Sequence, residues 1–185
     1  GTPSVPKVDI IVGPGNAFVE EAKKDVYGMV GIDMLAGPTE LIVMCTKPFS
    51  ADALAWDIFS QAEHDEMATV GFFSNDRKQI EEVQNRIAVL LATNIRRKVI
   101  EKALSNAFFV YFHNTKQALD AVNDIAPEHM ELIGSEEEKK DILYPGILYV
   151  GDYTNVAMGD YYIGTNHVLP TGGSGRFVGG LSVDR

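Results

Sequence analysis

Short apolar runs alternate with longer stretches of helical spacing along almost all of this 185-residue chain. The apolar runs, each bounded by turn residues as buried strands are, cover 8–12, 41–45, 69–73, 107–112, 130–133 and 146–150. The helical patterns cover 17–27, 51–59, 76–105 with a break expected near 92–94, 115–125 and the stretch after Ser135. This alternation predicts an α/β fold of three layers, with a largely parallel sheet and helices on both of its faces.

Composition narrows the class of function. The chain is 45% hydrophobic with a net charge of −10, which argues against a nucleic-acid surface, because such a surface clusters Lys and Arg to neutralise phosphates. Cys45, the single cysteine, follows an apolar run. We therefore expect a buried strand residue and exclude both an internal disulfide and a multi-cysteine zinc site. No apolar run approaches the roughly 20 residues that span a bilayer, and no signal peptide is visible, so we expect a cytoplasmic protein without a membrane partner.

The ends of the chain suggest a piece of a longer protein. The sequence begins at Gly1 without a methionine and stops at Arg185 without a terminal signal. We expect residues 1–150 to form the α/β domain and residues 151–185 to form a Gly-rich loop and a truncated tail. We also expect Ser50, Thr115 and Ser135 to cap the helices that follow them.

The stretch 60–64, Ser-Gln-Ala-Glu-His, closes the helical run 51–59. On a helix Gln61 and His64 stand at i and i+3, so their side chains share one face. An amide oxygen and an imidazole nitrogen brought together there can bind a metal. The alternative is that both are solvated or capping groups, as polar residues at helix ends usually are.

Two further polar stretches adjoin predicted strands. Thr39 and Glu40 stand beside the strand 41–45, and strand ends in α/β sheets are where ligands bind; a capped turn is the alternative. Glu128 and His129 follow Pro127, which restricts the turn before the strand 130–133. An adjacent Glu and His held by such a turn suit acid–base chemistry, although an exposed polar loop is the other possibility.

The N-terminal strand, the turn 13–16 and the helix 17–27 have the layout of a nucleotide site. The pattern G-x-G-x-x-G is absent, however, and Glu20 and Glu21 would repel a pyrophosphate. Asn16 is therefore either a helix cap or a dinucleotide contact. The tail 159–176 is Gly-rich and polar, and polar groups in such a loop are either solvated or part of a site.

Five motifs, in one order along the chain, resemble the histidinol dehydrogenase family. They lie at 5–9 with 13–16, at 32–40, at 60–64, at 126–129, and at 159–161 with 166–171. The resemblance implies an incomplete Rossmann-like central domain of a zinc- and NAD-dependent enzyme of histidine biosynthesis. That enzyme oxidises L-histidinol through the aldehyde to L-histidine and uses two NAD.

The resemblance also implies roles for individual residues. Gln61, His64 and Asp160 match zinc ligands that also contact the substrate. His129 matches the group that takes the alcohol proton and also contacts the substrate, and Glu128 matches the group that activates water for the second oxidation. Asn16 matches an NAD contact. Thr39 stands where the family usually has a substrate-binding serine, and His167 matches a histidine of the substrate loop.

The resemblance further implies a homodimer that completes the site. In the family a histidine ligand and a substrate-binding glutamate come from a C-terminal segment of the partner subunit, beyond Arg185 here. We therefore expect the 185-residue chain alone to be inactive and to bind zinc weakly. Thr39 and Thr165 depart from the family pattern, which leaves open a related zinc dehydrogenase acting on another alcohol, such as a sulfonated diol. A detached, inactive domain kept as a binding module is the non-enzyme alternative.

Overall fold

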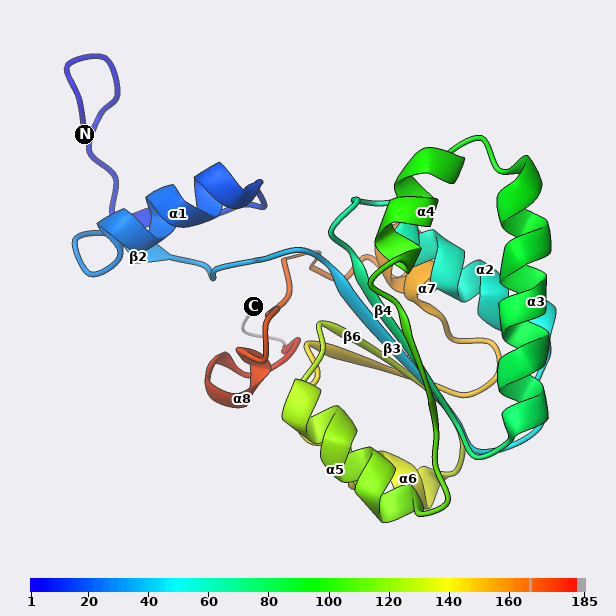
Figure 1. The fold of residues 1–185 in the computed structure, drawn as a ribbon. Coiled ribbons are helices and arrows are strands. Elements are labelled where there is room, and N and C mark those ends of the chain that lie inside the picture. The colour runs from blue at the N-terminus through cyan, green and yellow to red at the C-terminus, as the bar shows by residue number, and fades with distance from the viewer. Residues whose placement is uncertain (167, 183–185) are drawn as a thin grey trace.

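The computed structural model describes residues 1–166 and 168–182, and its central feature is a five-stranded parallel sheet (Figure 1). The strand order is β5-β4-β3-β6-β7. The strands are β3 (Glu40–Cys45), β4 (Thr69–Ser74), β5 (Phe108–Tyr111), β6 (His129–Ile133) and β7 (Ile147–Val150). Every pairing in this sheet is parallel, so the expected α/β fold is confirmed.

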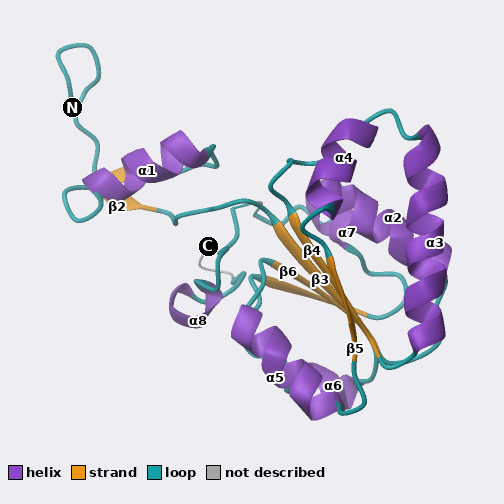
Figure 2. Ribbon diagram, in the orientation of Figure 1, coloured by secondary structure: helices purple, strands orange, loops and turns teal. Residues whose placement is uncertain are grey.

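Helices cover both faces of the sheet (Figure 2). One face carries α2 (Ala51–Ala62), α3 (Arg77–Thr93), α4 (Arg97–Leu104) and α7 (Val156–Tyr161), and the other carries α5 (Thr115–Ile125) and α6 (Glu136–Lys140). Alternate side chains of β3 divide between two cores, because successive residues of a strand point to opposite faces. Leu41, Val43 and Cys45 enter the α2 core, whereas Ile42 and Met44 enter the α5 core.

Side-chain caps fix several helix starts. The Ser50 hydroxyl accepts the N–H of Ala53 at the start of α2, and Ser135 forms a reciprocal capping box at α6. Both expected caps are confirmed. The expected Thr115 cap is wrong, because the Asn114 side chain accepts the N–H of Gln117 in the first turn of α5 and Thr115 is the first helical residue. An Asx side chain one position earlier reaches the N–H groups that the hydroxyl was expected to satisfy.

Residues 1–36 form an arm that extends from the body of the domain (Figure 1). It holds α1 (Ala17–Val26) and a small parallel sheet of β1 (Ile10–Ile11) and β2 (Gly31–Ile32). The expectation of a buried strand at 8–12 is wrong: only two residues are extended, and both are exposed. They pair with β2 outside the five-stranded sheet, so no helix layer covers them. Within the described residues, no helix has both the length and the apolarity to cross a membrane.

The tail is more ordered than its glycine content suggests. Asn155 accepts the N–H of Met158 and starts α7, so Gly159 and Asp160 are helical instead of lying in a loop. A second short helix, α8 (Gly175–Val178), follows further on. The loop expectation for 159–176 is therefore wrong at both ends; at α7 the Asn155 cap supplies what a glycine-rich segment lacks, whereas α8 starts without a side-chain cap.

Candidate active site

A cavity of about 280 Å³ opens at the edge of the sheet where the parallel strands begin. Its lining brings together residues that are far apart in the sequence, namely Thr39, Gln61, His64, Glu128, His129, Asp160 and Tyr161. Six of these seven residues carry sequence-based predictions. The structure therefore gathers all of the predicted site residues here except Asn16, which lies elsewhere, and His167, which is outside the described residues.

This cavity lies at the amino edge of the sheet and not at the carboxyl edge, where ligands of α/β sheets usually bind. Thr39 immediately precedes β3, and Glu128 immediately precedes β6. Helix α2 starts after the carboxyl end of β3 and runs back, so that Gln61 in its last turn meets Thr39. The site is thus assembled from strand starts and the end of a helix.

His64 lies beyond the end of α2, which differs from the expected shared helix face. The helix ends at Ala62, and the His64 N–H donates to the carbonyl of Gln61 at 3.2 Å in the turn that follows. Both side chains nevertheless line the cavity. A helix C-terminus favours a positive charge near it, and the last turn of α2 contains no basic side chain that would supply one.

A chain of hydrogen bonds joins Gln61, Thr39 and Glu128. The Gln61 Nε2 donates to the Thr39 hydroxyl, which donates in turn to Oε2 of Glu128 at 2.7 Å. Gln61 is only 1% exposed, and its Oε1 is buried without a hydrogen-bond partner among the described residues. A buried acceptor without a partner is costly, so this oxygen is the atom that a bound cation would satisfy.

His64 and Asp160 supply the other two candidate ligands. His64 Nε2 lies 3.8 Å from Oδ2 of Asp160, which comes from α7. Among the described residues, no group of three or more His, Cys, Asp or Glu side chains is arranged to hold a metal ion by itself. The amide oxygen of Gln61 brings the set of candidate ligands, with His64 and Asp160, to one nitrogen and two oxygens, donors that zinc accepts in open sites.

The Glu128 side chain is 7% exposed, which rules out the exposed-loop alternative. Burial raises the pKa of its carboxyl to about 7; hydrogen bonds from Thr39 and the Glu40 N–H oppose this, and the charges of Glu40 and Asp160 add to it. The Glu128 N–H donates back to Glu40 Oε2 at 3.3 Å. A carboxyl that titrates near neutrality is suited to act as a general base.

His129 is equally buried and lies against a residue that the sequence reasoning missed. Its Nε2 is 3.7 Å from Oε2 of Glu128, and its ring stacks on Tyr149 of β7 with centroids 6.1 Å apart. The Tyr149 hydroxyl lies 3.5 Å from His129 Nδ1. The sequence did contain a signal for this contact: a tyrosine stands within the apolar run 146–150, and a buried phenol needs a polar neighbour.

Asn16 lies in a second cavity, of about 440 Å³, between the arm and the domain. This cavity adjoins the first, since Thr39 and His64 line both. The Asn16 side chain accepts the N–H groups of Phe18 and Val19 at the start of α1, which confirms the helix-cap interpretation. Its position beside the first cavity leaves the dinucleotide contact as a prediction.

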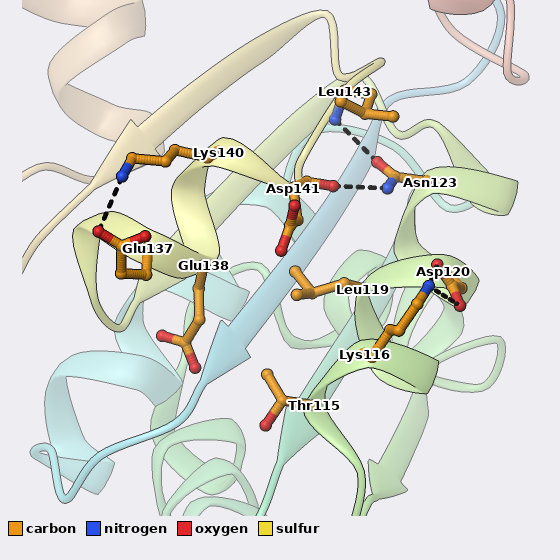
Figure 3. Close-up of a pocket in the computed structure, with 10 residues that line it drawn as sticks. All are labelled: Thr115, Lys116, Leu119, Asp120, Asn123, Glu137, Glu138, Lys140, Asp141 and Leu143. Carbon is orange, nitrogen blue, oxygen red and sulfur yellow. Dashed lines mark hydrogen bonds and ion pairs between the residues drawn. The ribbon is translucent and has the colours of Figure 1, made fainter.

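A larger cavity, of about 510 Å³, lies at α5 and α6 (Figure 3). Its charged side chains pair within their own helices, Lys116 with Asp120 at 3.0 Å and Lys140 with Glu137 at 2.7 Å. Both lysines of the lining are therefore taken up by neighbours on their own helix instead of converging on a ligand. The amino-edge cavity, with its buried acid and its unpartnered amide oxygen, is the stronger candidate for chemistry.

Comparison with known proteins gives one consistent family. The model of the family described as histidinol dehydrogenase matches residues 1–185. A histidinol dehydrogenase of Nitrosospira multiformis is 46% identical over 99% of this chain and 42% of its own length. One from Staphylococcus aureus is 40% identical over 100% of this chain and 45% of its own length.

A solved structure agrees with the sequence comparison. The crystal structure of histidinol dehydrogenase from Elizabethkingia anophelis matches with a TM-score of 0.92 and 32% identity, over 100% of this chain and 43% of that chain. The present chain therefore spans less than half the length of the relatives that it matches.

Proposed function

The chain belongs to the histidinol dehydrogenase family, and on this premise we propose that it forms the catalytic core of a zinc- and NAD-dependent enzyme of histidine biosynthesis. The proposed reaction oxidises L-histidinol, an amino alcohol, through the aldehyde to L-histidine. The observation that supports it most is the meeting of Gln61, His64, Asp160, Glu128 and His129 in one cavity.

The residues present fit a zinc ion. Gln61 would bind through the Oε1 that has no partner in the described residues, while Thr39 holds the Nε2 of the same amide. His64 and Asp160, 3.8 Å apart, would supply the nitrogen and the second oxygen. The chemistry supplied by bound zinc is that of a template that orients the imidazole and amino group of the substrate.

Two of the chain's own residues would move protons. His129 takes the proton of the substrate hydroxyl in the first oxidation, because a neutral imidazole accepts a proton near neutral pH. Glu128 takes a proton from the water that attacks the aldehyde carbon before the second oxidation, for which its pKa of about 7 is suited. Tyr149, beside Nδ1 of His129, holds the orientation of the ring.

We place NAD in the second cavity, which Asn16 lines and which adjoins the first through Thr39 and His64. Glu20 and Glu21 also line it, but Glu20 accepts the Ala36 N–H and Glu21 pairs with Lys24, so both carboxylates have partners. The chemistry supplied by NAD is acceptance of one hydride in each oxidation. That cavity has glycine backbone at Gly15 and Gly37, where side chains would otherwise keep a planar ligand from the main chain.

We infer that the present chain needs the rest of the protein for activity. The relatives are more than twice as long as the part that matches, and the family resemblance implies a further histidine ligand from a segment beyond Arg185. A homodimer in which the partner subunit completes the site accounts for both points. The 185-residue chain alone would then bind zinc weakly and produce no NADH.

The test is an assay of the full-length protein with zinc, NAD and L-histidinol. We expect two NADH per L-histidine formed, and a loss of about 10²-fold to 10⁴-fold in Glu128→Gln, as removal of a general base costs. Glu101→Gln is the matched control, since this exposed glutamate pairs with Arg97 far from the site. A zinc-loaded protein that turns over a sulfonated diol and not histidinol would refute the proposed substrate.

A further inference from the structure

Two carboxyl side chains lie buried one layer behind the candidate active site. Asp57 of α2 is 9% exposed and Glu131 of β6 is 1% exposed. Neither lines the cavity that holds Glu128 and His129, and the proposed reaction does not use either. Buried acids are rare unless they are paired, so their presence here needs a physical reason.

Both carboxyls act on the start of α7. Asp57 Oδ1 accepts a 2.9 Å hydrogen bond from the Asn155 side chain, and Glu131 Oε1 accepts a 2.7 Å bond from the Val156 N–H. Asn155 in turn accepts the N–H of Met158 as the N-cap of the helix. One carboxyl from a helix and one from a strand thus converge on two consecutive residues of a third element.

The same three elements, α2, α7 and β6, also carry residues of the candidate site. Asp57 and Gln61 are four residues apart on α2, and Val156 and Asp160 are four apart on α7, so each pair shares a helix face. Glu131 and His129 are two apart on β6 and share a face of the sheet. The buried carboxyls therefore connect the same three elements that bring Gln61, His129 and Asp160 together, at positions further from the cavity.

No lysine or arginine lies beside the two carboxyls among the described residues. Among the described residues neither acid forms an ion pair, and Glu131 Oε2 is buried without a hydrogen-bond partner. The titratable groups that face Glu131 are Asp57, Tyr149 of β7 and His129 of its own strand. Two ionised carboxylates in such a place would repel each other and leave one charge uncompensated.

The electrostatics agree with this geometry. Burial raises the pKa of Glu131 well above its ordinary value, and the neighbouring charge of Asp57 raises it further. Burial also raises the pKa of Asp57, against a lowering effect of the Asn155 hydrogen bond. Each carboxyl accepts one hydrogen bond, and Glu131 is the more deeply buried of the two, so burial disfavours its charged form more.

We propose that Asp57 and Glu131, which bind consecutive residues of α7, carry a single proton between them, called here the shared proton, and act as a positioning pair, which fixes the first turn of α7 and thereby holds Asp160 in the site with Gln61 and His129. The pair neither contacts the substrate nor binds the metal. Its effect on zinc rests on the proposed function, whereas the shared proton and the docking of α7 do not.

Three variants of the full-length protein test the pair. Glu131→Gln keeps the shape and the acceptor for Val156 without a charge, and Glu131→Leu removes the acceptor. Asp52→Asn, on the exposed side of α2 where Asp52 pairs with Arg86, is the matched control. Zinc affinity is measured by competition with a chromophoric chelator, and folding by circular dichroism.

We expect Glu131→Leu to weaken zinc binding about 10-fold to 100-fold, as loss of a group that orients a ligand does, and Glu131→Gln and Asp52→Asn to stay within about twofold of wild type. A folded Glu131→Leu with unchanged zinc affinity would overturn the positioning role. So would a Glu131→Gln whose zinc affinity falls as much as that of Glu131→Leu. If Glu131→Leu does not fold, Asn155→Ala replaces it, because that variant removes the donor to Asp57; unchanged zinc affinity there also overturns the role.

The shared proton has its own readout, which needs neither zinc nor substrate. The infrared spectrum of the wild type at neutral pH should contain a protonated carboxyl band that Glu131→Gln lacks and Asp52→Asn keeps. Absence of that difference would show that both acids are ionised and would reject the shared proton. A wild-type protein with the band but without zinc binding or turnover would refute the proposed function and leave the pair standing.

Discussion

The Thr39 hydroxyl donates a 2.7 Å hydrogen bond to Oε2 of Glu128 and so connects the start of β3 to the start of β6. A hydroxyl has one proton to donate, so the bond from Gln61 Nε2 to the same hydroxyl must be one that Thr39 accepts. One side chain thus orients the amide of the candidate ligand and stabilises the ionised form of the candidate base. The following predictions use the full-length protein.

Replacing Thr39 with valine should weaken zinc binding about 10-fold and lower kcat, because the Gln61 amide loses the acceptor that turns its oxygen toward the metal. Thr39→Ser keeps the hydroxyl and should stay close to wild type in both measurements. Chelator competition and steady-state kinetics check this. Equal losses in Thr39→Ser, which keeps the hydroxyl, and in Thr39→Val, which lacks it, would contradict the role of the hydroxyl.

The rate of aldehyde oxidation should fall as the pH falls, because only the ionised Glu128 carboxylate can accept a proton from water. Burial raises the pKa of this carboxyl to about 7 in the absence of metal, and the charge of bound zinc lowers it. The acidic limb of the kcat profile should therefore lie below about pH 7 and should be missing from the residual activity of Glu128→Gln. A limb that persists in this variant would assign the titration to another group.

The stability of the protein should decrease as the pH rises above about 4.5, the ordinary value of a glutamate carboxyl. The native pKa of Glu131 is raised above that of the unfolded chain, so the native state holds more protons in this window and the free energy of unfolding falls with pH. Glu131→Gln cannot lose this proton. Urea unfolding at about pH 5 and about pH 8 should show a smaller decrease in the variant than in wild type.

Asp52→Asn serves as the control for that measurement, since its carboxyl is exposed and pairs with Arg86. Its pH dependence should match that of wild type. A Glu131→Gln curve that runs parallel to the wild-type curve over the whole window would mean that Glu131 ionises at an ordinary pH and would contradict the raised pKa.

Gly159 leaves room for Tyr149. A methyl group at residue 159 would meet the Tyr149 hydroxyl at a distance that real Cβ atoms do not adopt, so Gly159→Ala must displace either Tyr149 or α7. Both movements disturb the site, because Tyr149 contacts His129 and α7 carries Asp160. We expect a kcat lower by about 10-fold or more, in keeping with the cost of small misplacements in an active site.

A double variant separates this steric effect from a change in helix propensity. Tyr149→Phe removes the nearest of the atoms that the new methyl group meets, so the loss caused by Gly159→Ala should be smaller in the Tyr149→Phe background than in wild type. Kinetics of the two single variants and the double variant complete the cycle. Strictly additive losses would show that the contact with Tyr149 is not the cause.

Local sequence patterns were sufficient for the main elements. The alternation of apolar runs with helical spacing predicted all five strands of the main sheet and its parallel order, because burial on both faces of a sheet imposes that pattern. The break between α3 and α4 and the caps at Ser50 and Ser135 were equally local. The failure at 8–12 shows the limit, since an apolar run reveals that a segment is extended but not what covers it.

The candidate site was only partly accessible from the sequence. The residue types at Gln61, His64, Glu128, His129 and Asp160 were visible as motifs, and the family resemblance assigned their roles. The helical setting of Asp160, the turn that holds His64 and the stacking of Tyr149 on His129 were not visible. Each depends on a cap or a neighbour that spacing along the chain does not encode.

The sequence by itself determined which segments are strands and helices and which polar side chains stand at their ends, because those properties depend on near neighbours. The tertiary structure alone decided that these side chains meet at the amino edge of the sheet, with Thr39 between Gln61 and Glu128, and that Asp57 and Glu131 both bind the start of α7. Those contacts depend on strand order and on the direction in which α2 and α7 cross the sheet. Burial in that shared interior is also what raises the pKa values of Glu128 and Glu131, and no single segment can supply it.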